Sequence, residues 1–254
     1  MRSEPTHGLI TVPGFCGAFD GRVVSRPAMP APVVSIGYPF AGKPSFGGLK
    51  GGWRRIQHVL MDVDGVIVPA RPSFRDWLSE HGISDAMTAP FFKGPFQECL
   101  VGRADLPQVL TPYLPQWGWR QGVEAFMAIW FRVEQGVNSE LLTMLDALRR
   151  ENVGVHLATN QEAHRTGYLL SEMGLAAHVE QVFASCRVGH IKPSESYLSA
   201  IVSGLGCSKG ELLLWDDSPY NVEQAREFGL KAELFHSAPQ FRNRMRDYFP
   251  LLIL

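Results

Sequence analysis

The chain has 254 residues, of which 45% are hydrophobic and 19% are charged, a composition typical of a globular protein with a sizeable core. Its 24 basic and 25 acidic residues give a formal net charge of -1, so neither nucleic acid nor an anionic membrane is an expected partner. The sequence lacks a CxxC pair, a secretory apolar stretch and a run near the roughly 20 apolar residues that span a bilayer. We therefore expect a cytoplasmic protein with reduced thiols.

Residues 1–55 differ from the rest of the chain. Glycine and proline recur throughout this segment, and no helical or strand period lasts more than a few residues. Such a composition is typical of a poorly ordered extension. We assign no activity to it.

From Ile56 onward, short apolar runs alternate with helical stretches, a pattern that predicts a mainly parallel sheet in an α/β fold. The predicted strands are Val59–Val63, Val153–Ala158, Gln181–Ser185, Leu212–Trp215 and Ala232–Phe235. The predicted helices are one that follows Ser139 as N-cap, then Glu162–Met173, Ser194–Ser203, Val222–Phe228 and Gln240–Tyr248.

An aromatic-rich interruption, residues 70–136, separates the first two predicted strands. It is too long for an ordinary connection, so we expect an inserted helical subdomain at the carboxyl edge of the sheet, where ligands bind in open α/β folds. Residues 56–69 and 137–254 would then form the core domain. The simplest account of the aromatic side chains is that they form the core of the insert itself.

The first predicted strand leads into two aspartates, Asp62 and Asp64, followed by Gly65. Residues two apart on a strand point the same way, and two such carboxylates repel unless a cation or a shared proton holds them. The pattern alone is also typical of calcium loops and plain turns.

Three further polar motifs follow other predicted strands: Thr159-Asn160, Lys192-Pro193 and Asp216-Asp217-Ser218. Each has a structural explanation by itself, such as a helix N-cap or an exposed loop. Their joint position around one sheet edge favours a functional site.

In their order, strand contexts and spacings, these four motifs resemble those of the haloacid dehalogenase (HAD) superfamily. The resemblance covers roughly residues 56–236, and the run DDSPYNVEQAREFG is similar to a subgroup with a small helical cap and a sugar-phosphatase branch. It implies a HAD-like Rossmannoid parallel sheet of five core strands with an inserted cap. It also implies that Asp64 offers its backbone carbonyl to a metal ion.

The residues themselves suit phosphoryl transfer. Asp62 would be the nucleophile that forms an aspartyl-phosphate, and Asp64 would protonate the leaving oxygen and then activate water. A carboxylate approaches a phosphate dianion when Mg²⁺ neutralises the charge, and Asp62, Asp217 and Asp216 are the available ligands for that ion. The resemblance adds the backbone carbonyl of Asp64 to this set.

The remaining motif residues would bind the phosphate. We expect a hydroxyl contact from Thr159, donors from Asn160 or nearby backbone N–H groups, and a fixed positive charge from Lys192. Asn221 occupies a position where an acidic residue is frequent in the superfamily, and we expect it to orient its neighbours by hydrogen bonds.

Asp64 favours a phosphatase over a dehalogenase, because a halide leaves without a proton whereas an alkoxide benefits from a general acid. A phosphomutase on a sugar phosphate and a non-catalytic HAD-like binding module remain alternatives. The expected substrate is a small phosphate ester of the sugar-phosphate kind. Neither its identity nor the oligomeric state follows from the sequence.

Four further polar side chains are weaker candidates. Lys93 and Arg103 of the insert either meet a polar substrate or form surface charges and local ion pairs. We expect His156 to be a satisfied core residue and His190 to lie at the rim of the site.

Overall fold

The computed structural model describes residues 55–251, all of which belong to one compact unit of the chain. The predicted N-terminal extension therefore lies outside the described residues. Within residues 55–251, no helix combines the length and the apolar character needed to cross a membrane.

A five-stranded parallel sheet forms the centre of this unit, in the order β3-β2-β1-β4-β5. The three central strands are apolar and almost wholly buried, as expected for strands covered on both faces. The prediction of a five-stranded α/β fold is confirmed. The strands are β1 His58–Met61, β2 Gly154–Thr159, β3 Gln181–Ala184, β4 Leu212–Asp216 and β5 Lys231–Leu234.

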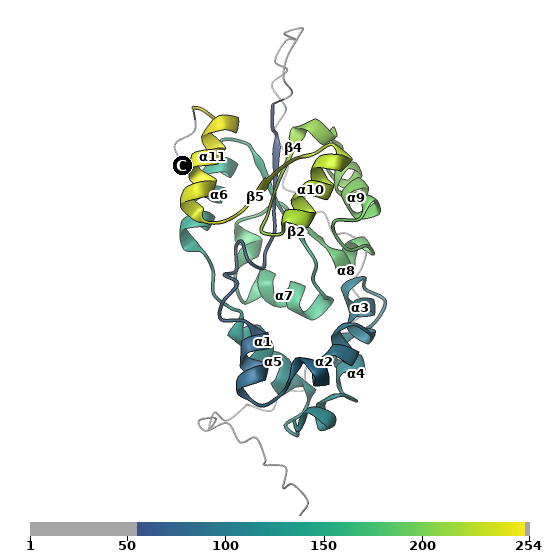
Figure 1. The fold of residues 1–254 in the computed structure, drawn as a ribbon. Helices are drawn as coiled ribbons and strands as arrows, with labels where there is room; N and C mark the ends of the chain where they lie inside the picture. The colour runs from purple at the N-terminus through teal and green to yellow at the C-terminus, as the bar shows by residue number, and fades with distance from the viewer. Residues whose placement is uncertain (1–54, 252–254) are drawn as a thin grey trace, which may run out of the picture. The chain divides into compact units, whose positions relative to one another are not determined.

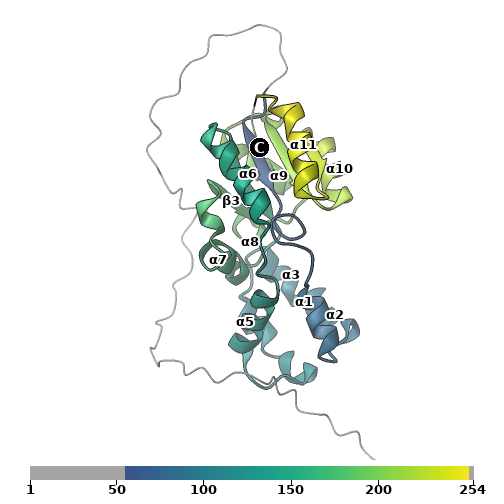
Figure 2. The same cartoon turned by 90° about the vertical axis from the view of Figure 1, so that its left-hand side faces the viewer.

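Helices cover both faces of the sheet. On one face, alternate β1 residues Val59 and Met61 pack with side chains of α6 (Ser139–Arg150) and α11 (Ala238–Tyr248). On the other face, Leu60 packs with α9 (Glu195–Leu205) and α10 (Pro219–Phe228). The two views show α6 and α11 together on one side of the strands and α9 and α10 on the other (Figures 1 and 2).

The segment between β1 and α6 is helical and has its own core. Buried aromatic rings from several of its helices pack together, among them Phe91, Trp117 and Phe126. The expected role of these aromatics as an internal core is confirmed, whereas the limits 70 and 136 stay a prediction. The elements are α1 Phe74–Glu80, α2 Asp85–Phe92, α3 Pro95–Leu100, α4 Leu106–Leu110, the 3₁₀ helix η1 Leu114–Trp117 and α5 Val123–Val133.

Several boundaries differ from those expected. β1 ends at Met61 because the chain turns at Gly65, where φ is +82° and the Gly65 N–H donates to the Val68 carbonyl at 2.7 Å. The N-cap of α6 is Asn138, whose side chain accepts from the Leu141 N–H.

The segments after β2, β3 and β4 also differ in their limits. A short helix not predicted, α8 (Ser185–Val188), follows β3, and α10, capped by Ser218, begins at Pro219, three residues ahead of the predicted start at Val222. The remaining elements are α7 (Ala163–Ser171) and the 3₁₀ helices η2 (Leu175–Ala177) and η3 (Lys209–Glu211).

Candidate active site

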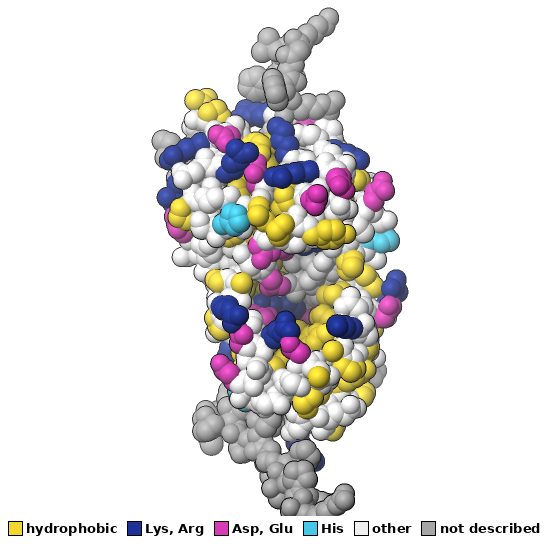
Figure 3. All heavy atoms as spheres, in the orientation of Figure 1, with side chains coloured by type: hydrophobic (Ala, Val, Ile, Leu, Met, Phe, Trp, Pro, Cys, Tyr) yellow, Lys and Arg dark blue, Asp and Glu magenta, His cyan; other side chains and the backbone are white. Residues whose placement is uncertain are grey.

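The loops that follow β1, β2 and β4, together with the loop before α9, meet at the carboxyl edge of the sheet. In Figure 1 the helical insert lies beside this edge, and α7 lies between the two. Figure 3 shows a hollow between the sheet and the insert, with acidic side chains inside it and basic ones along its lower rim. The polar motifs predicted from the sequence therefore come together from positions far apart in the chain.

Three carboxylates at this edge form a group that suits a metal ion. Asp62, Asp216 and Asp217 each offer an oxygen, and these oxygens lie within 4.8 Å of one another. Asp62 and Asp216 are buried, whereas Asp217 is exposed. Hard oxygen ligands of this kind are the ones that Mg²⁺ takes.

Lys192 lies at the centre of this group and is buried. Its ammonium group contacts the Asp62 carboxylate at 2.6 Å and the Asp216 carboxylate at 2.7 Å, and it donates to the Ala158 carbonyl at 3.0 Å. Burial alone would lower the pKa of Lys192, but the two carboxylates raise it above its usual value. Lys192 is therefore a fixed positive charge beside Asp62.

Two asparagines hold the charged groups in place. The side chain of Asn160 donates to the Lys192 carbonyl at 3.0 Å and accepts from the Lys192 N–H at 2.8 Å. Asn221 donates to Asp216 at 3.0 Å, which confirms its expected orienting role. Both ends of the Asn160 side-chain amide are bonded to the Lys192 backbone. The predicted contact of this side chain with phosphate therefore stays a prediction, and the geometry does not favour it.

The group carries more negative than positive charge. Burial raises the pKa of the Asp62 carboxyl, with Asp216 adding to the effect and Lys192 opposing it. Burial and Asp216 likewise raise the pKa of Asp217. A divalent cation among these oxygens would offset the excess charge, so the donor set fits Mg²⁺.

Gly65 allows two of the loops to approach closely. A Cβ atom placed on Gly65 would lie 1.9 Å from a carboxylate oxygen of Asp217. The glycine next to the aspartate pair is therefore required both for its positive φ and for the position of Asp217.

Asp64 lies apart from the three-carboxylate group and is exposed. Its carboxylate accepts a hydrogen bond at 2.6 Å from the side-chain amide of Gln161, which is buried. Glu134, at the end of α5, has a pKa raised by burial and by the charge of Asp64, so these two carboxylates lie near each other.

Gln161 was not among the predicted site residues. It directly follows Thr159-Asn160, but its contact with Asp64 joins positions 97 residues apart. Thr159 is buried at the end of β2, and its contact with phosphate stays a prediction.

The weaker candidates fall into two groups. Arg103 pairs with Glu98 at 2.6 Å, the local ion pair that was one of its two expected roles, and Lys93 and His190 are exposed. His156 is buried, with one ring nitrogen 3.1 Å from a ring nitrogen of His58 and the other without a hydrogen-bond partner. His156 is therefore a core residue that is only partly satisfied.

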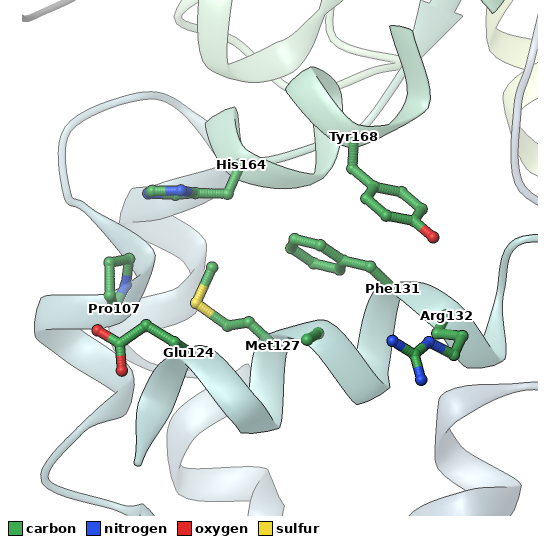
Figure 4. A pocket seen from close by; sticks show the side chains of 8 residues that line it. Pro107, Glu124, Met127, Phe131, Arg132, His164 and Tyr168 are labelled. Atoms are coloured by element: carbon green, nitrogen blue, oxygen red, sulfur yellow. The ribbon is translucent and has the colours of Figure 1, made fainter. Parts of the chain in front are cut away.

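A separate cavity of about 450 Å³ lies between α5 and α7. Figure 4 shows Phe131 and Met127 from α5 facing His164 and Tyr168 from α7. None of the carboxylates described above lines this cavity. It belongs to the junction between the insert and the core.

The chain is similar in sequence to known hydrolases. A family model described as haloacid dehalogenase-like hydrolase matches residues 56–229. The GMP/IMP nucleotidase YrfG of Escherichia coli is 21% identical over 189 residues, which are 70% of this chain and 82% of that protein. Flavin mononucleotide hydrolase 1 of Arabidopsis thaliana is 26% identical over 104 residues, 41% of this chain and 42% of that protein.

Solved structures share the fold. A HAD-family enzyme of Bacteroides thetaiotaomicron, 18% identical, has a TM-score of 0.67 and covers 76% of this chain and 100% of its own. A magnesium complex of the same enzyme has a TM-score of 0.66. A HAD-like hydrolase of Porphyromonas gingivalis, 21% identical, has a TM-score of 0.64, with 76% of this chain and 99% of that one covered.

Proposed function

The chain belongs to the haloacid dehalogenase-like hydrolases, and from that membership we propose that it is a Mg²⁺-dependent phosphatase of small phosphorylated metabolites. The observation that carries the proposal is the contact of Lys192 with both Asp62 and Asp216, together with the position of Asp217. Its carboxylate lies close enough to the other two for all three to hold one metal ion. Such a site combines a carboxylate nucleophile, a fixed cation and ligands for a metal.

Asp62 is the nucleophile in this proposal. The Lys192 ammonium and the Val63 N–H, at 2.7 Å, both meet its Oδ1 atom. Those contacts fix the carboxylate and leave Oδ2 as the atom that attacks phosphorus. The P–O bond to the leaving group breaks as the aspartyl-phosphate forms, and water later attacks that phosphorus to release inorganic phosphate.

Asp62, Asp217 and the Asp64 carbonyl would hold the magnesium ion, with Asp216 within reach. When bound, the ion neutralises the negative charge of the phosphoryl group, which would otherwise be repelled by the carboxylates. Asp216 already receives the Lys192 ammonium, the Asn221 amide and the Ser218 N–H, so its main task is to hold Lys192 and the loop before α10.

The phosphoryl oxygens would be bound by Lys192, by the Thr159 hydroxyl and by backbone N–H groups after β2. Because Lys192 is buried and held by three oxygens, its charge stays in place during the reaction. Preorganised charge of this kind needs no rearrangement when the transition state forms.

Asp64 is the general acid and base. Its exposed carboxyl group lies apart from the ion-pair group, as a residue that exchanges protons with the leaving oxygen and with water requires. Its presence favours a phosphatase over a dehalogenase. A phosphomutase needs the same pair of aspartates and remains the alternative to test.

The insert would contact the leaving group. We propose a sugar-phosphate-like substrate, and nucleoside monophosphates are a second class with support of their own. The relatives named above act on GMP or IMP and on flavin mononucleotide.

Release of inorganic phosphate from an aryl phosphate, with Mg²⁺ or with a chelator, tests the reaction. We expect hydrolysis that requires Mg²⁺ and that Asp62→Asn abolishes, because the amide is not a nucleophile. A panel of sugar phosphates, nucleoside monophosphates and flavin mononucleotide then identifies the leaving group.

Three outcomes would contradict the proposal. Full activity of Asp62→Asn would exclude the covalent route, and a wild-type enzyme inactive on every ester would exclude a phosphatase. Conversion of a sugar phosphate to an isomer through a stable bisphosphate would indicate the mutase.

A further inference from the structure

We propose that Gln161 is a positioning residue that holds the Asp64 carboxyl group in the orientation from which it protonates the leaving oxygen. The inference rests on the proposed phosphatase reaction, in which Asp64 is the general acid. It assigns a task to a side chain that lies outside the four sequence motifs.

The contact between the two side chains is direct. The Gln161 amide donates to Oδ2 of Asp64 at 2.6 Å, and Gln161 is 5% exposed whereas Asp64 is exposed. A buried amide aimed at an exposed carboxylate restricts the mobile member of the pair. Because the hydrogen bond takes Oδ2, Oδ1 is the atom that remains to carry the proton to the leaving group.

The backbone of Gln161 is itself fixed. The Ser185 hydroxyl accepts from the Gln161 N–H at 3.0 Å, and the Gln161 carbonyl accepts from the Ser185 hydroxyl and the Cys186 N–H, both at 3.3 Å. Ser185 is fully buried at the start of α8. The end of β3 thus supports Gln161, and Gln161 supports Asp64.

Asp64 requires such support because of its surroundings. The charge of Asp64 acts on the carboxyl groups of both Asp217 and Glu134, and like charges repel one another. The next residue is Gly65, with φ at +82°, so no side chain there packs against Asp64. The Gln161 amide is a neutral group with both a donor and an acceptor, and it can pair with a carboxyl group that does or does not carry a proton.

Two esters that differ in the acidity of the leaving group test this role. A nitrophenolate leaves readily without a proton, whereas a phenolate needs the general acid more. For Gln161→Met, which removes the amide at similar size, we expect kcat/KM on phenyl phosphate to fall by about tenfold or more. On 4-nitrophenyl phosphate we expect a fall of at most about threefold.

The ratio of the two kcat/KM values is the decisive readout, because it does not depend on the fraction of protein that is folded. Gln161→Glu keeps the shape but places a like charge against Asp64, and we expect the same selective loss. Gln224→Met is the matched control, since Gln224 also donates to a carboxylate, Glu227, at 2.7 Å, on the exposed side of α10. We expect both esters to be hydrolysed by this control as by the wild type.

Other results would overturn the inference. Equal losses on both esters, no loss on either, or a faster reaction with phenyl phosphate would show that Gln161 does not position the acid. If the proposed function itself is wrong, the result differs: the wild type hydrolyses neither ester. The proposed role of Gln161 would then be wrong as well.

Discussion

At the scale of single residues, Gly65 is where a side chain would do most harm. A Cβ atom there would lie 1.9 Å from the Asp217 carboxylate, and the positive φ adds its own strain. We expect Gly65→Ala to displace Asp217 and to abolish both the proposed phosphate release and the rise in melting temperature that we expect Mg²⁺ to cause. Thermal unfolding with and without Mg²⁺ measures the second effect.

Gly82→Ala separates displacement from backbone strain. Gly82 has φ at +75° with nothing within 4 Å of an added Cβ, so the variant carries the strain alone, about 1–2 kcal/mol. We expect it to melt earlier than the wild type and to keep its response to Mg²⁺. A normal Mg²⁺ response in Gly65→Ala would contradict the prediction.

His156 makes the stability of the fold depend on pH. Burial lowers the pKa of His156 from 6.5 to about 3, and the neighbouring His58 adds to the effect. Between these two pKa values the unfolded chain binds more protons than the folded one, so the free energy of unfolding falls as the pH falls. The full contribution of neutral His156 is present above pH 6.5 and is lost progressively toward pH 3.

His156→Phe should flatten this dependence, because phenylalanine keeps a ring but does not titrate. We expect the slope of the free energy of unfolding against pH to decrease by up to about 1.4 kcal/mol per pH unit in that window. Urea unfolding at several pH values measures the slope, and the comparison at pH 8 gives the combined effect of packing and of the lost contact with His58. An unchanged slope would show that His156 does not cause the dependence.

At the scale of elements, α7 connects the site to the insert. Its first turn follows Gln161, and its buried Arg165 donates to the carbonyls of Phe131 at 3.0 Å and Glu134 at 2.6 Å, at the end of α5. The guanidinium group also lies over the Phe131 and Tyr168 rings, 5.6 Å from each centre. One helix therefore holds the last helix of the insert next to the loop that carries Gln161.

Arg165→Met should loosen this junction. The change removes two charge-assisted hydrogen bonds and leaves carbonyls unpaired, so we expect the free energy of unfolding to fall by about 2–4 kcal/mol. Arg150→Met, at an exposed position of α6, is the matched control, with an expected change within about 0.5 kcal/mol. Equal changes in the two variants, measured by urea unfolding, would contradict the assigned role of Arg165.

The elements themselves could be predicted from the sequence to different degrees. The apolar runs that became β1 to β5 are short but clearly bounded, so the five strands and their succession along the chain could be predicted from the hydrophobic pattern. Their order in the sheet was not predicted. The end of β1 could not be predicted, because it depends on the turn that the hydrogen bond from the Gly65 N–H to the Val68 carbonyl closes. The N-cap of α6 could not either, because Asn138 and Ser139 are adjacent residues that both suit this position. The short helix α8 was missed because four residues carry no helical period.

At the scale of the whole molecule, the site depends on parallel strands ending at one edge. This rule is enough to predict that Asp62, Lys192 and Asp217 lie near one another. It cannot predict which partner each side chain takes. The clamp of Asn160 on Lys192 and the contact of Gln161 with Asp64 depend on loop conformation, which local sequence does not determine.

The excess of acidic groups at this edge should lower the free energy of unfolding of the metal-free protein, because the carboxylates repel one another. Burial and Asp216 raise the pKa of Asp217, so ionised Asp217 opposes folding at neutral pH. Between its ordinary and its raised pKa the folded state binds more protons, and stability falls as the pH rises. We therefore expect Asp217→Asn to melt at a higher temperature than the wild type in the presence of a chelator.

Mg²⁺ should reverse that order. An ion that binds the folded state alone stabilises it by about 2.7 kcal/mol at one hundred times its dissociation constant, and Asp217→Asn would lose most of this gain with its ligand oxygen. Asp247→Asn is the control, because Asp247 is exposed and pairs with Arg244 at 2.6 Å near the end of α11, outside the four motifs. It should keep the Mg²⁺ response and gain no stability in chelator. If Asp217→Asn melted below the wild type in chelator, the repulsion would be too weak to matter, and the carboxylate would serve folding as well as the metal.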